Sequence, residues 1–268
     1  MSKAPELFGN EEDTAVQRAV YRLWPVLSAH PKLCTNGRTL GFCDPSSEDV
    51  PIILELAKAF GRIGVYFTTP EVVEQVRLAA IQERLETAQG WLTLNAKTDA
   101  AKLCEGIIAQ NNPQGYDLLR IANDTPGETI SEFQSLQEES GVAPVPGYFM
   151  RGNAKPCVSI AATDPHGHVV STALAIKTYH PECRYKDWVH VGYLSTRKEL
   201  RGRGLSKYLL AQVIADAFER LGAHYVWTGV KHDNEPSKSV CRACGMAEVE
   251  LTGMFVTNPT IVTRQFTR

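Results

Sequence analysis

Along the chain, two spacings of apolar residues alternate, one typical of strands and the other of helices. In residues 61–69, GRIGVYFTT, the apolar residues Ile63, Val65 and Phe67 alternate with small or polar neighbours, which predicts a strand. Thr69 and Pro70 then form a favourable helix start, a hydroxyl cap followed by proline at the first helical position. A strand, WLTLNA, and a helix, KTDAAKLCEGIIAQ, come later. The helix from Pro70 is predicted to reach about Gly90, with one apolar face formed by Val72, Val73, Val76, Ala79 and Ala80.

A cluster of Asn, Pro and Gly at residues 111–115, NNPQG, predicts a linker between two domains, 1–115 and 116–268. The second domain starts with a strand, YDLLRIAN, and a helix, ETISEFQSLQEES. PCVSIAAT and HVVSTALAIKTY then predict a hairpin around the turn DPHGH. The strand WVHVGYL, a helix from Leu205 to Leu221, the strand HYVWTGV, the short helix PSKSVCRAC and the strand VELTGMFVT follow. We therefore expect an α/β fold whose second domain is a mixed sheet with helices on both faces.

Composition excludes several classes of protein. The 268 residues are 43 % hydrophobic, and 28 basic against 30 acidic residues give a net charge of −2. This balance argues against a disordered chain, a dedicated nucleic-acid binder or a polybasic membrane binder. No apolar run is long enough to span a bilayer, and the first residues lack the apolar core of a secretory signal. Seven scattered cysteines, an odd number, indicate reduced thiols in a cytoplasmic protein.

The most informative segment is the basic loop between the strand that ends at Leu194 and the helix that begins at Leu205. A helix start exposes unpaired backbone N–H groups, and glycines allow a phosphate to approach them closely. The loop therefore predicts a phosphate or pyrophosphate site at residues 202–206. Five cations within eleven residues support an anion site: Arg197, Lys198, Arg201, Arg203 and Lys207.

Other interpretations of the loop fit less well. A P-loop requires GxxxxGK[ST], which is absent, and GRGLS is too short for a dinucleotide fingerprint. Taken by itself, GRG could also be a flexible, solvated turn.

Two motifs resemble those of the GCN5-related N-acetyltransferase (GNAT) superfamily, over about 150 residues from Tyr116 onward. The phosphate loop of that family, Q/R-x-x-G-x-G/A, is matched by Arg201, Gly202, Arg203, Gly204, Leu205 and Ser206, with serine at the last position. The second motif, N-x-x-A-x-x-x-Y-x-x-x-G-F, is matched at Asn234 and Gly245, while Ser237, Cys241 and Met246 replace its Ala, Tyr and Phe. The two motifs stand in the expected order and at the expected separation.

The resemblance implies an acyl-CoA-dependent transferase. The main chain of Leu194, Ser195 and Thr196 would hold the pantetheine arm and the acetyl carbonyl of acetyl-CoA. The amides of residues 202–206 would hold the pyrophosphate, and Asn234 would reach the pantetheine. An amine of a small molecule or peptide would then attack the thioester directly, without an acyl-enzyme and without a metal.

The catalytic acid and base are less clear from the sequence. Cys241 stands where the family has its acid, although a small buried packing residue is the interpretation that we favour. Trp188 stands where many relatives carry a basic carboxylate. His190 has the same side-chain parity two residues later and is our candidate base, while a structural histidine is the alternative. Further candidates for the base are Asp187, His232 and Asp233, or a chain of water molecules.

Three features remain open. The Pro-rich stretch GVAPVPGYFMRGN could line an acceptor pocket with Tyr148, Phe149 and Arg151, or simply pack. HGH at residues 166–168 is expected to be a solvated turn, because two histidines without a third ligand do not form a metal site. Residues 1–115 contain no chemical motif, and a degenerate second acetyltransferase-like domain that binds no CoA is one interpretation of them.

Two alternatives to catalysis remain: a silent CoA-binding sensor, and an adaptor in which the first half binds a partner. The sequence identifies neither the acceptor nor the oligomeric state.

Overall fold

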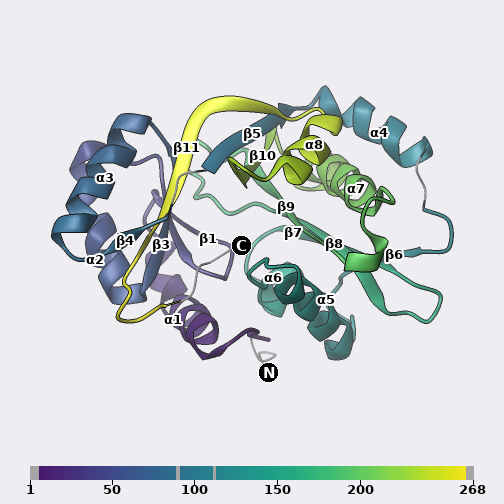
Figure 1. Ribbon diagram of the computed structural model, residues 1–268, viewed down its shortest axis with the longest axis horizontal. Coiled ribbons are helices and arrows are strands. Elements are labelled where there is room, and N and C mark those ends of the chain that lie inside the picture. Colours follow the sequence, from purple (N-terminus) through teal and green to yellow (C-terminus); the bar gives the residue numbers. More distant parts are fainter. Residues whose placement is uncertain (1–5, 89–90, 111–112, 264–268) are drawn as a thin grey trace.

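In the computed structural model, which describes residues 6–88, 91–110 and 113–263, strands from both halves of the chain join one mixed sheet (Figure 1). The order is β1-β2-β3-β11-β5-β10-β9-β8-β7-β6, with β4 paired to β11. Only β2 with β3 and β9 with β10 pair in parallel among the described strands. The strands are β1 (Leu33–Thr35), β2 (Leu40–Cys43), β3 (Arg62–Thr68), β4 (Glu86–Thr87), β5 (Trp91–Lys97), β6 (Asp117–Arg120), β7 (Cys157–Thr163), β8 (Val169–Ile176), β9 (Trp188–Thr196), β10 (Tyr225–Lys231) and β11 (Ala247–Thr257).

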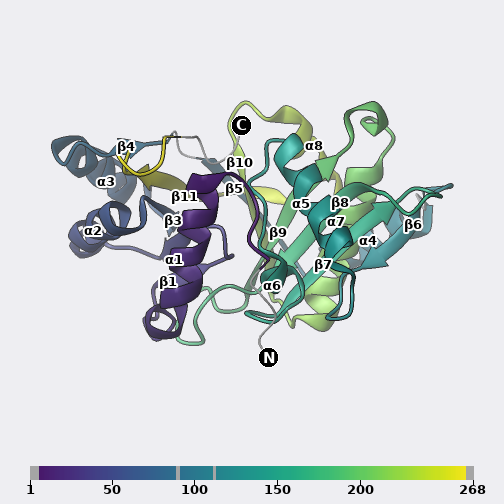
Figure 2. The same ribbon diagram turned by 90° about the horizontal axis from the view of Figure 1, so that it is seen from below.

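Helices cover both faces of the sheet, which confirms the predicted fold class. In Figure 1, α4, α7 and α8 lie above the second half of the sheet and α5 and α6 lie below it, so that α5 and α6 are on the near side in Figure 2. The α7 side holds one apolar core, and α5 and α6 cover another. The α-helices are α1 (Glu11–Leu27), α2 (Val50–Phe60), α3 (Pro70–Gln82), α4 (Ala100–Gln110), α5 (Gly127–Glu139), α6 (Gly147–Met150), α7 (Leu205–Arg220) and α8 (Glu235–Ala243).

The same succession of elements occurs once in each half. An antiparallel strand pair leads through a short 3-10 turn into a helix, then a strand parallel to the one before it, then a second helix. In the first half this is β1, β2, the turn Ser47–Asp49, α2, β3 and α3. In the second half it is β8, β9, the turn Lys198–Leu200, α7, β10 and α8. The two halves therefore share one order of elements and one pattern of strand pairing.

Beyond the short strand β4, the two halves exchange the longer strand that comes after this succession. β5 comes after α3 in the sequence but pairs with β10, whereas β11 comes after α8 but pairs with β3 (Figure 1). Leu94 of β5 and Cys104 of α4 belong to the same apolar core as α7. The division of the chain at residue 115 therefore stays a prediction. Residues from both sides of that position share one apolar core.

The helix predicted from Pro70 to about Gly90 begins as expected but ends at Gln82. Thr69 caps its start by accepting a hydrogen bond from the backbone of Val72. At its end Arg84 adopts a left-handed conformation with φ 57°, and the backbone of Leu85 donates to Ala80. Because this left-handed residue is not glycine, no local signal for a helix end is present there.

The predicted hairpin of β7 and β8 is confirmed. The strands pair antiparallel around a turn in which Asp164 accepts from the backbone of His166 and His168. Of the predicted linker 111–115, residues 111–112 lie outside the described residues, as do residues 89–90 near the expected helix end. Within the described part of the chain, every helix is too short or too polar to cross a bilayer.

Candidate functional site

The central feature of the site is a gap in the hydrogen-bond ladder between β9 and β10. These parallel strands pair at three positions, the last of which joins His190 to Trp227. Beyond that point β9 continues along β8 as far as Thr196, while β10 continues along β5 as far as Lys231. The two strands therefore diverge toward their carboxyl ends. Their facing backbone groups are left available to a ligand that lies between them.

A β-bulge lies where the strands diverge. The register between β8 and β9 shifts so that Gly192 faces Leu174 while Ser195 faces Thr172. Gly192 has φ 135° and Tyr193 has φ 55°, a left-handed conformation that is unusual for tyrosine. The bulge places Tyr193 in the core under α5, whereas Val191 packs on the α7 side. Such re-aiming of side chains beside a site is a common use of bulges.

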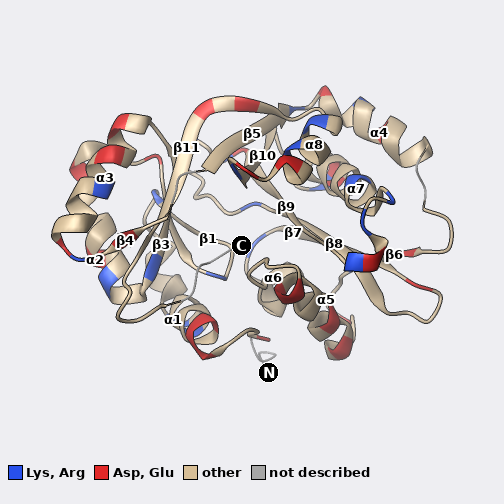
Figure 3. Ribbon diagram, in the orientation of Figure 1, with Lys and Arg blue, Asp and Glu red and all other residues tan. Residues whose placement is uncertain are grey.

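The predicted phosphate loop leads from β9 into α7. Gly202 and Gly204 both adopt left-handed conformations, with φ 78° and 84°, and a Cβ added to either would meet nothing within 4 Å. Gly204 is the N-cap of α7 and offers no side-chain cap, so the first amides of the helix have no internal partner. Arg203 is exposed, whereas Leu205 is buried in the core below. Figure 3 shows basic residues following this loop into the helix.

Hydroxyl groups tie the end of β9 to the start of α7. Thr196 Oγ1 lies 2.7 Å from the hydroxyl of Ser171 and 2.8 Å from that of Ser206. Arg201 Nε donates to the carbonyl of Thr196. The serine that replaces Gly or Ala in the loop motif thus holds the helix start against the sheet.

Leu194 and Ser195, two of the residues whose main chain is predicted to hold the pantetheine arm, follow the bulge directly. Leu194 packs against the α7-side core, and Ser195 is only 2 % exposed. The hydroxyl of Ser195 is one of the few buried polar side-chain atoms without a hydrogen-bond partner in the described structure. An orphaned buried hydroxyl beside the strand gap fits a site that receives a polar ligand group.

His190 lies at the apex of the gap. Its ring stacks on Trp227 with centroids 4.4 Å apart, and its Nδ1 lies 2.8 Å from the hydroxyl of Tyr193. Burial and, secondly, the positive charge of Arg38 lower the pKa of His190 to about 3. The imidazole is therefore neutral at physiological pH.

Asn234 and Cys241 lie on the other side of the gap, at α8. Asn234 caps this helix by accepting from the backbone of Ser237 at 3.1 Å, and its side chain is half-buried. Cys241 is 3 % exposed and belongs to the core under α7. Burial raises the pKa of Cys241 to about 12. The structure therefore brings Asn234 to the mouth of the gap and places Cys241 in an apolar environment.

The other candidate bases lie away from the apex of the gap. Asp187 precedes β9 at the end where the strands are still paired, and its carbonyl accepts from the backbone of His224. His232 and Asp233 are exposed just beyond the end of β10.

The aromatic residues of the Pro-rich stretch pack against neighbouring side chains. Phe149 is 1 % exposed, and Tyr148 contacts Tyr21 edge to face at 5.0 Å. Arg151 forms a bidentate ion pair with Glu6 and donates to three backbone carbonyls. Of the two interpretations of this stretch, ordinary packing is the one that the structure supports.

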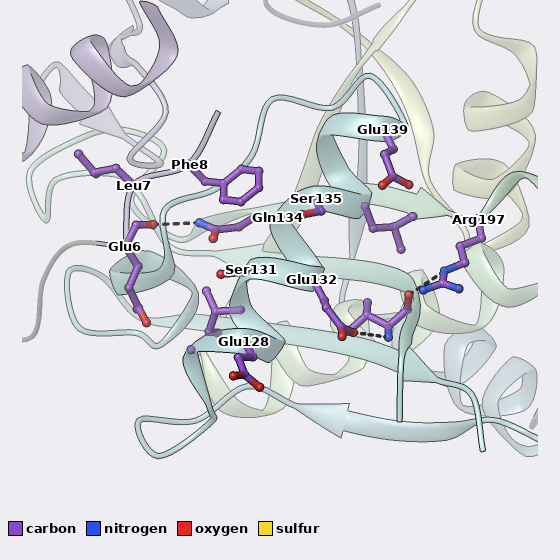
Figure 4. A pocket seen from close by; sticks show the side chains of 14 residues that line it. Glu6, Leu7, Phe8, Glu128, Ser131, Glu132, Gln134, Ser135, Glu139 and Arg197 are labelled. Carbon is purple, nitrogen blue, oxygen red and sulfur yellow. Dashed lines mark hydrogen bonds between the residues drawn. The ribbon is translucent and has the colours of Figure 1, made fainter. Parts of the chain in front are cut away.

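An open hollow of about 800 Å³ lies beside this stretch, along α5 (Figure 4). It runs from the segment Glu6–Phe8 to Arg197, which donates from its Nε to the carbonyl of Val169. Its rim is mainly acidic and includes Glu128, Glu132 and Glu139. This hollow reaches Arg197, the first of the five cations of the basic loop, but none of the residues predicted to contact CoA or to act in catalysis lines it.

Two residues of the site come from the first half and were not predicted. Asn36, between β1 and β2, donates to the hydroxyl of Tyr193 at 3.0 Å, and the guanidinium of Arg38 lies 4.5 Å from the centre of the Tyr193 ring. Both side chains are buried. Asn36 and Tyr193 are 157 positions apart, and no motif marks the pair.

The corresponding loop of the first half, between β2 and α2, is closed by its own carboxylate. Asp49 accepts from the backbone and hydroxyl of Ser46, at 2.7 and 2.8 Å, and pairs with Lys32 at 2.6 Å. Residues 43–50, CDPSSEDV, contain no glycine. The first half therefore has a carboxylate, held by Ser46 and Lys32, where the second half has its glycine-rich loop.

Comparison with known proteins finds a matching family model and solved structures with a similar fold. Residues 118–246 match the model of the acetyltransferase (GNAT) family. No curated protein matches the chain in sequence. The structure is similar to a GCN5-related N-acetyltransferase from Kribbella flavida, with 13 % identity over 91 % of this chain and 95 % of that one and a TM-score of 0.55.

Two further solved structures resemble the chain. A GCN5-related N-acetyltransferase-like protein from Streptococcus suis 89/1591 shares 14 % identity, over 92 % of this chain and 100 % of that one, with a TM-score of 0.55. A tandem GNAT protein from the clavulanic acid biosynthesis pathway shares 14 % identity, over 76 % of this chain and 67 % of that one, with a TM-score of 0.51. At these identities the likeness establishes the fold.

Proposed function

Since residues 118–246 form a domain of the acetyltransferase (GNAT) family, we propose that the protein transfers the acetyl group of acetyl-CoA to a primary amine of a small molecule or peptide. Acyl transfer is the general chemistry of this family and fold. One observation carries the proposal to this chain: the gap between β9 and β10 leads to an uncapped helix start flanked by two open, left-handed glycines. An extended ligand with an anionic group along its length, such as acetyl-CoA, fits a strand gap that leads to a helix start of this kind.

In this proposal the pantetheine arm of acetyl-CoA lies between the diverging strands. Backbone groups of Leu194, Ser195 and Thr196 pair with its amides, and Asn234 approaches it from α8. The pyrophosphate binds the amides of residues 202–206, with Arg201 and Arg203 beside it. The left-handed glycines and the open space around them support this placement, because a Cβ there would crowd the phosphate.

The amine nitrogen attacks the thioester carbonyl, a new C–N bond forms, and the C–S bond breaks to release CoA thiolate. The attacking alkylammonium, with a pKa of ~10.4, must first lose a proton. The equilibrium constant for transfer of that proton to an imidazole of pKa about 3 is smaller than one by roughly seven powers of ten. The ratio of free amine to ammonium in water at pH 7 is smaller than one by only about three and a half powers of ten. His190 in this state therefore contributes as a hydrogen-bonding group more effectively than as a base.

The same comparison applies to the leaving group. A CoA thiolate with a pKa of ~8.5 gains little from a neighbouring thiol whose pKa is about 12. Proximity and orientation of the two reactants, together with polar groups around the carbonyl, then supply most of the rate enhancement.

Replacement of Cys241 by alanine tests its candidate role as the acid. We expect a loss of less than tenfold in kcat, because the buried thiol contributes packing, and a fall of about 1 kcal/mol in the free energy of unfolding. Steady-state kinetics and chemical denaturation measure the two effects. A loss of several hundredfold in a folded variant would instead make Cys241 the acid.

A panel of amines, incubated with the protein and acetyl-CoA, tests the proposed function. Release of free CoA thiol, with a matching acetylated product by mass spectrometry, is the expected result for at least one amine. The pKa values of His190 and Cys241 suit neither a base nor an acid near pH 7. They therefore support a second candidate function, a CoA-binding module without catalysis. Tight binding of acetyl-CoA without turnover across the whole panel would support that candidate.

A further inference from the structure

The loop between β1 and β2 reaches across from the first half and lies against the site in the second half. Gly37 at its tip has φ 84°, and a Cβ added there would lie 2.5 Å from the ring of Phe149. Thr35 stabilises the turn by accepting from the backbone of Gly37 and donating to the carbonyl of Thr39. The close approach of Gly37 brings the neighbouring Asn36 to β9.

The hydrogen bonds around Asn36 have only one consistent direction. The backbone N–H of Arg38 donates to Asn36 Oδ1 at 3.2 Å, which leaves the Nδ2 of Asn36 to donate to the hydroxyl oxygen of Tyr193 at 3.0 Å. The hydroxyl oxygen already accepts this bond, so its proton is free to point to Nδ1 of His190, 2.8 Å away. With the hydroxyl proton in that position, Nδ1 accepts and the neutral ring carries its own proton on Nε2.

We propose that Asn36 is a positioning residue that fixes His190 as the Nε2–H tautomer, so that His190 offers a hydrogen-bond donor to an oxygen of the bound substrate. The role of His190 as a donor to substrate rests on the proposed acyl-transfer function, whereas the assignment of its tautomer rests only on the hydrogen bonds. His190 is partly exposed, and its Nε2 has no partner among the described residues. The donor lies at the apex of the strand gap, where the proposed function places the carbonyl oxygen of the thioester.

The surroundings of His190 favour the neutral ring. Arg38 is the charged group that acts on it, and the ring is otherwise covered by Trp227 and Tyr193. Arg38 also donates to the carbonyl of Ala143, which holds the guanidinium beside the Tyr193 ring. A protonated imidazole would lose the bond from Tyr193 and would face this positive charge.

The test replaces Asn36 by aspartate, which has the same shape but two acceptor oxygens. One oxygen still accepts from the backbone of Arg38, and the other accepts the hydroxyl proton of Tyr193. The oxygen of Tyr193 then becomes an acceptor toward His190, so the ring should change to the Nδ1–H tautomer. Nitrogen-15 NMR of the full chain distinguishes the two tautomers, and the spectrum of a His190→Gln variant assigns the signal among the seven histidines.

We expect the wild type to show Nε2–H and to remain neutral well below pH 6, and Asn36→Asp to show Nδ1–H with a pKa raised by about one unit or more. Asn10→Asp is the matched control, because it adds the same charge in the same half where aspartate can replace asparagine as the cap of α1. If Asn36→Asp does not fold, Tyr193→Phe removes the donor to Nδ1 and should give a mixture of tautomers.

Two results would overturn the inference: a wild-type ring protonated on Nδ1 or titrating near pH 6.5, and a tautomer unchanged in both variants. In kinetics, Asn36→Asp should lower kcat by roughly tenfold and change acetyl-CoA binding much less, because a bond to the carbonyl oxygen is strongest as that oxygen becomes negative. The NMR result is independent of turnover. A protein that fails to bind acetyl-CoA but shows the expected tautomers would therefore contradict the proposed function and not the role of Asn36.

Discussion

Replacement of Gly204 by glutamate is expected to abolish acetyl-CoA binding, with a loss of at least a hundredfold in affinity. The residue is the N-cap of α7 in an open, left-handed conformation, and the new carboxylate would occupy the place assigned to the pyrophosphate. The like charge would repel the phosphates, and the side chain would cover the amides that bind them. Calorimetric titration of the variant with acetyl-CoA measures the loss.

Gly167→Glu is the matched control for this substitution. Gly167 has φ 85° and open space around it, in the exposed turn between β7 and β8, so the backbone strain and the added charge are the same. Both variants should lose about 1 kcal/mol of stability from the left-handed conformation. Only Gly204→Glu should lose CoA binding, and equal affinities in the two variants would refute the assigned phosphate site.

The second large effect concerns pH. For an alkylamine acceptor, kcat/KM should rise about tenfold per pH unit from pH 6 to pH 9, or roughly a thousandfold in total, because the free amine is the reacting form. His190, with a pKa of about 3, and Cys241, with a pKa of about 12, do not change protonation within this range. Neither group should therefore add a midpoint to the profile.

The control for this profile is an acceptor whose amine has a pKa below 6, for which the same plot should be nearly flat. A bell-shaped curve or a plateau with a midpoint near pH 6.5 for both acceptors would contradict the account. It would mean that a group of the protein acts as a base near neutral pH, and His190 would again be the first candidate.

The loop between β9 and α7 could be predicted from the sequence because its signals are local. Gly202 and Gly204 are required by backbone conformation at their own positions, and the helix that follows has an apolar face of ordinary period. The hairpin of β7 and β8 and the cap at Thr69 depend on neighbours a few residues away and were likewise predictable. Turns, caps and glycine conformations of this kind depend on residues close in sequence and little on the rest of the fold.

The contribution of the first half could not be predicted in the same way. The exchange of β5 and β11 depends on pairings such as Trp227 with Asn95, which join distant segments. Asn36 reaches Tyr193 only because Gly37 fits against Phe149. Similarly, the low pKa of His190 arises from burial and from Arg38, which the local sequence around the histidine does not show.

Calorimetric titration of the folded wild-type protein with acetyl-CoA, compared with its form lacking the 3′-phosphate, tests the central claim most directly. We predict one site per chain with micromolar affinity, weaker for the ligand that lacks the 3′-phosphate because the cations around the loop then have one anionic group fewer to bind. Absence of binding by either form, in a sample whose circular dichroism and thermal transition show a folded chain, would contradict the assignment of a CoA site to the gap between β9 and β10.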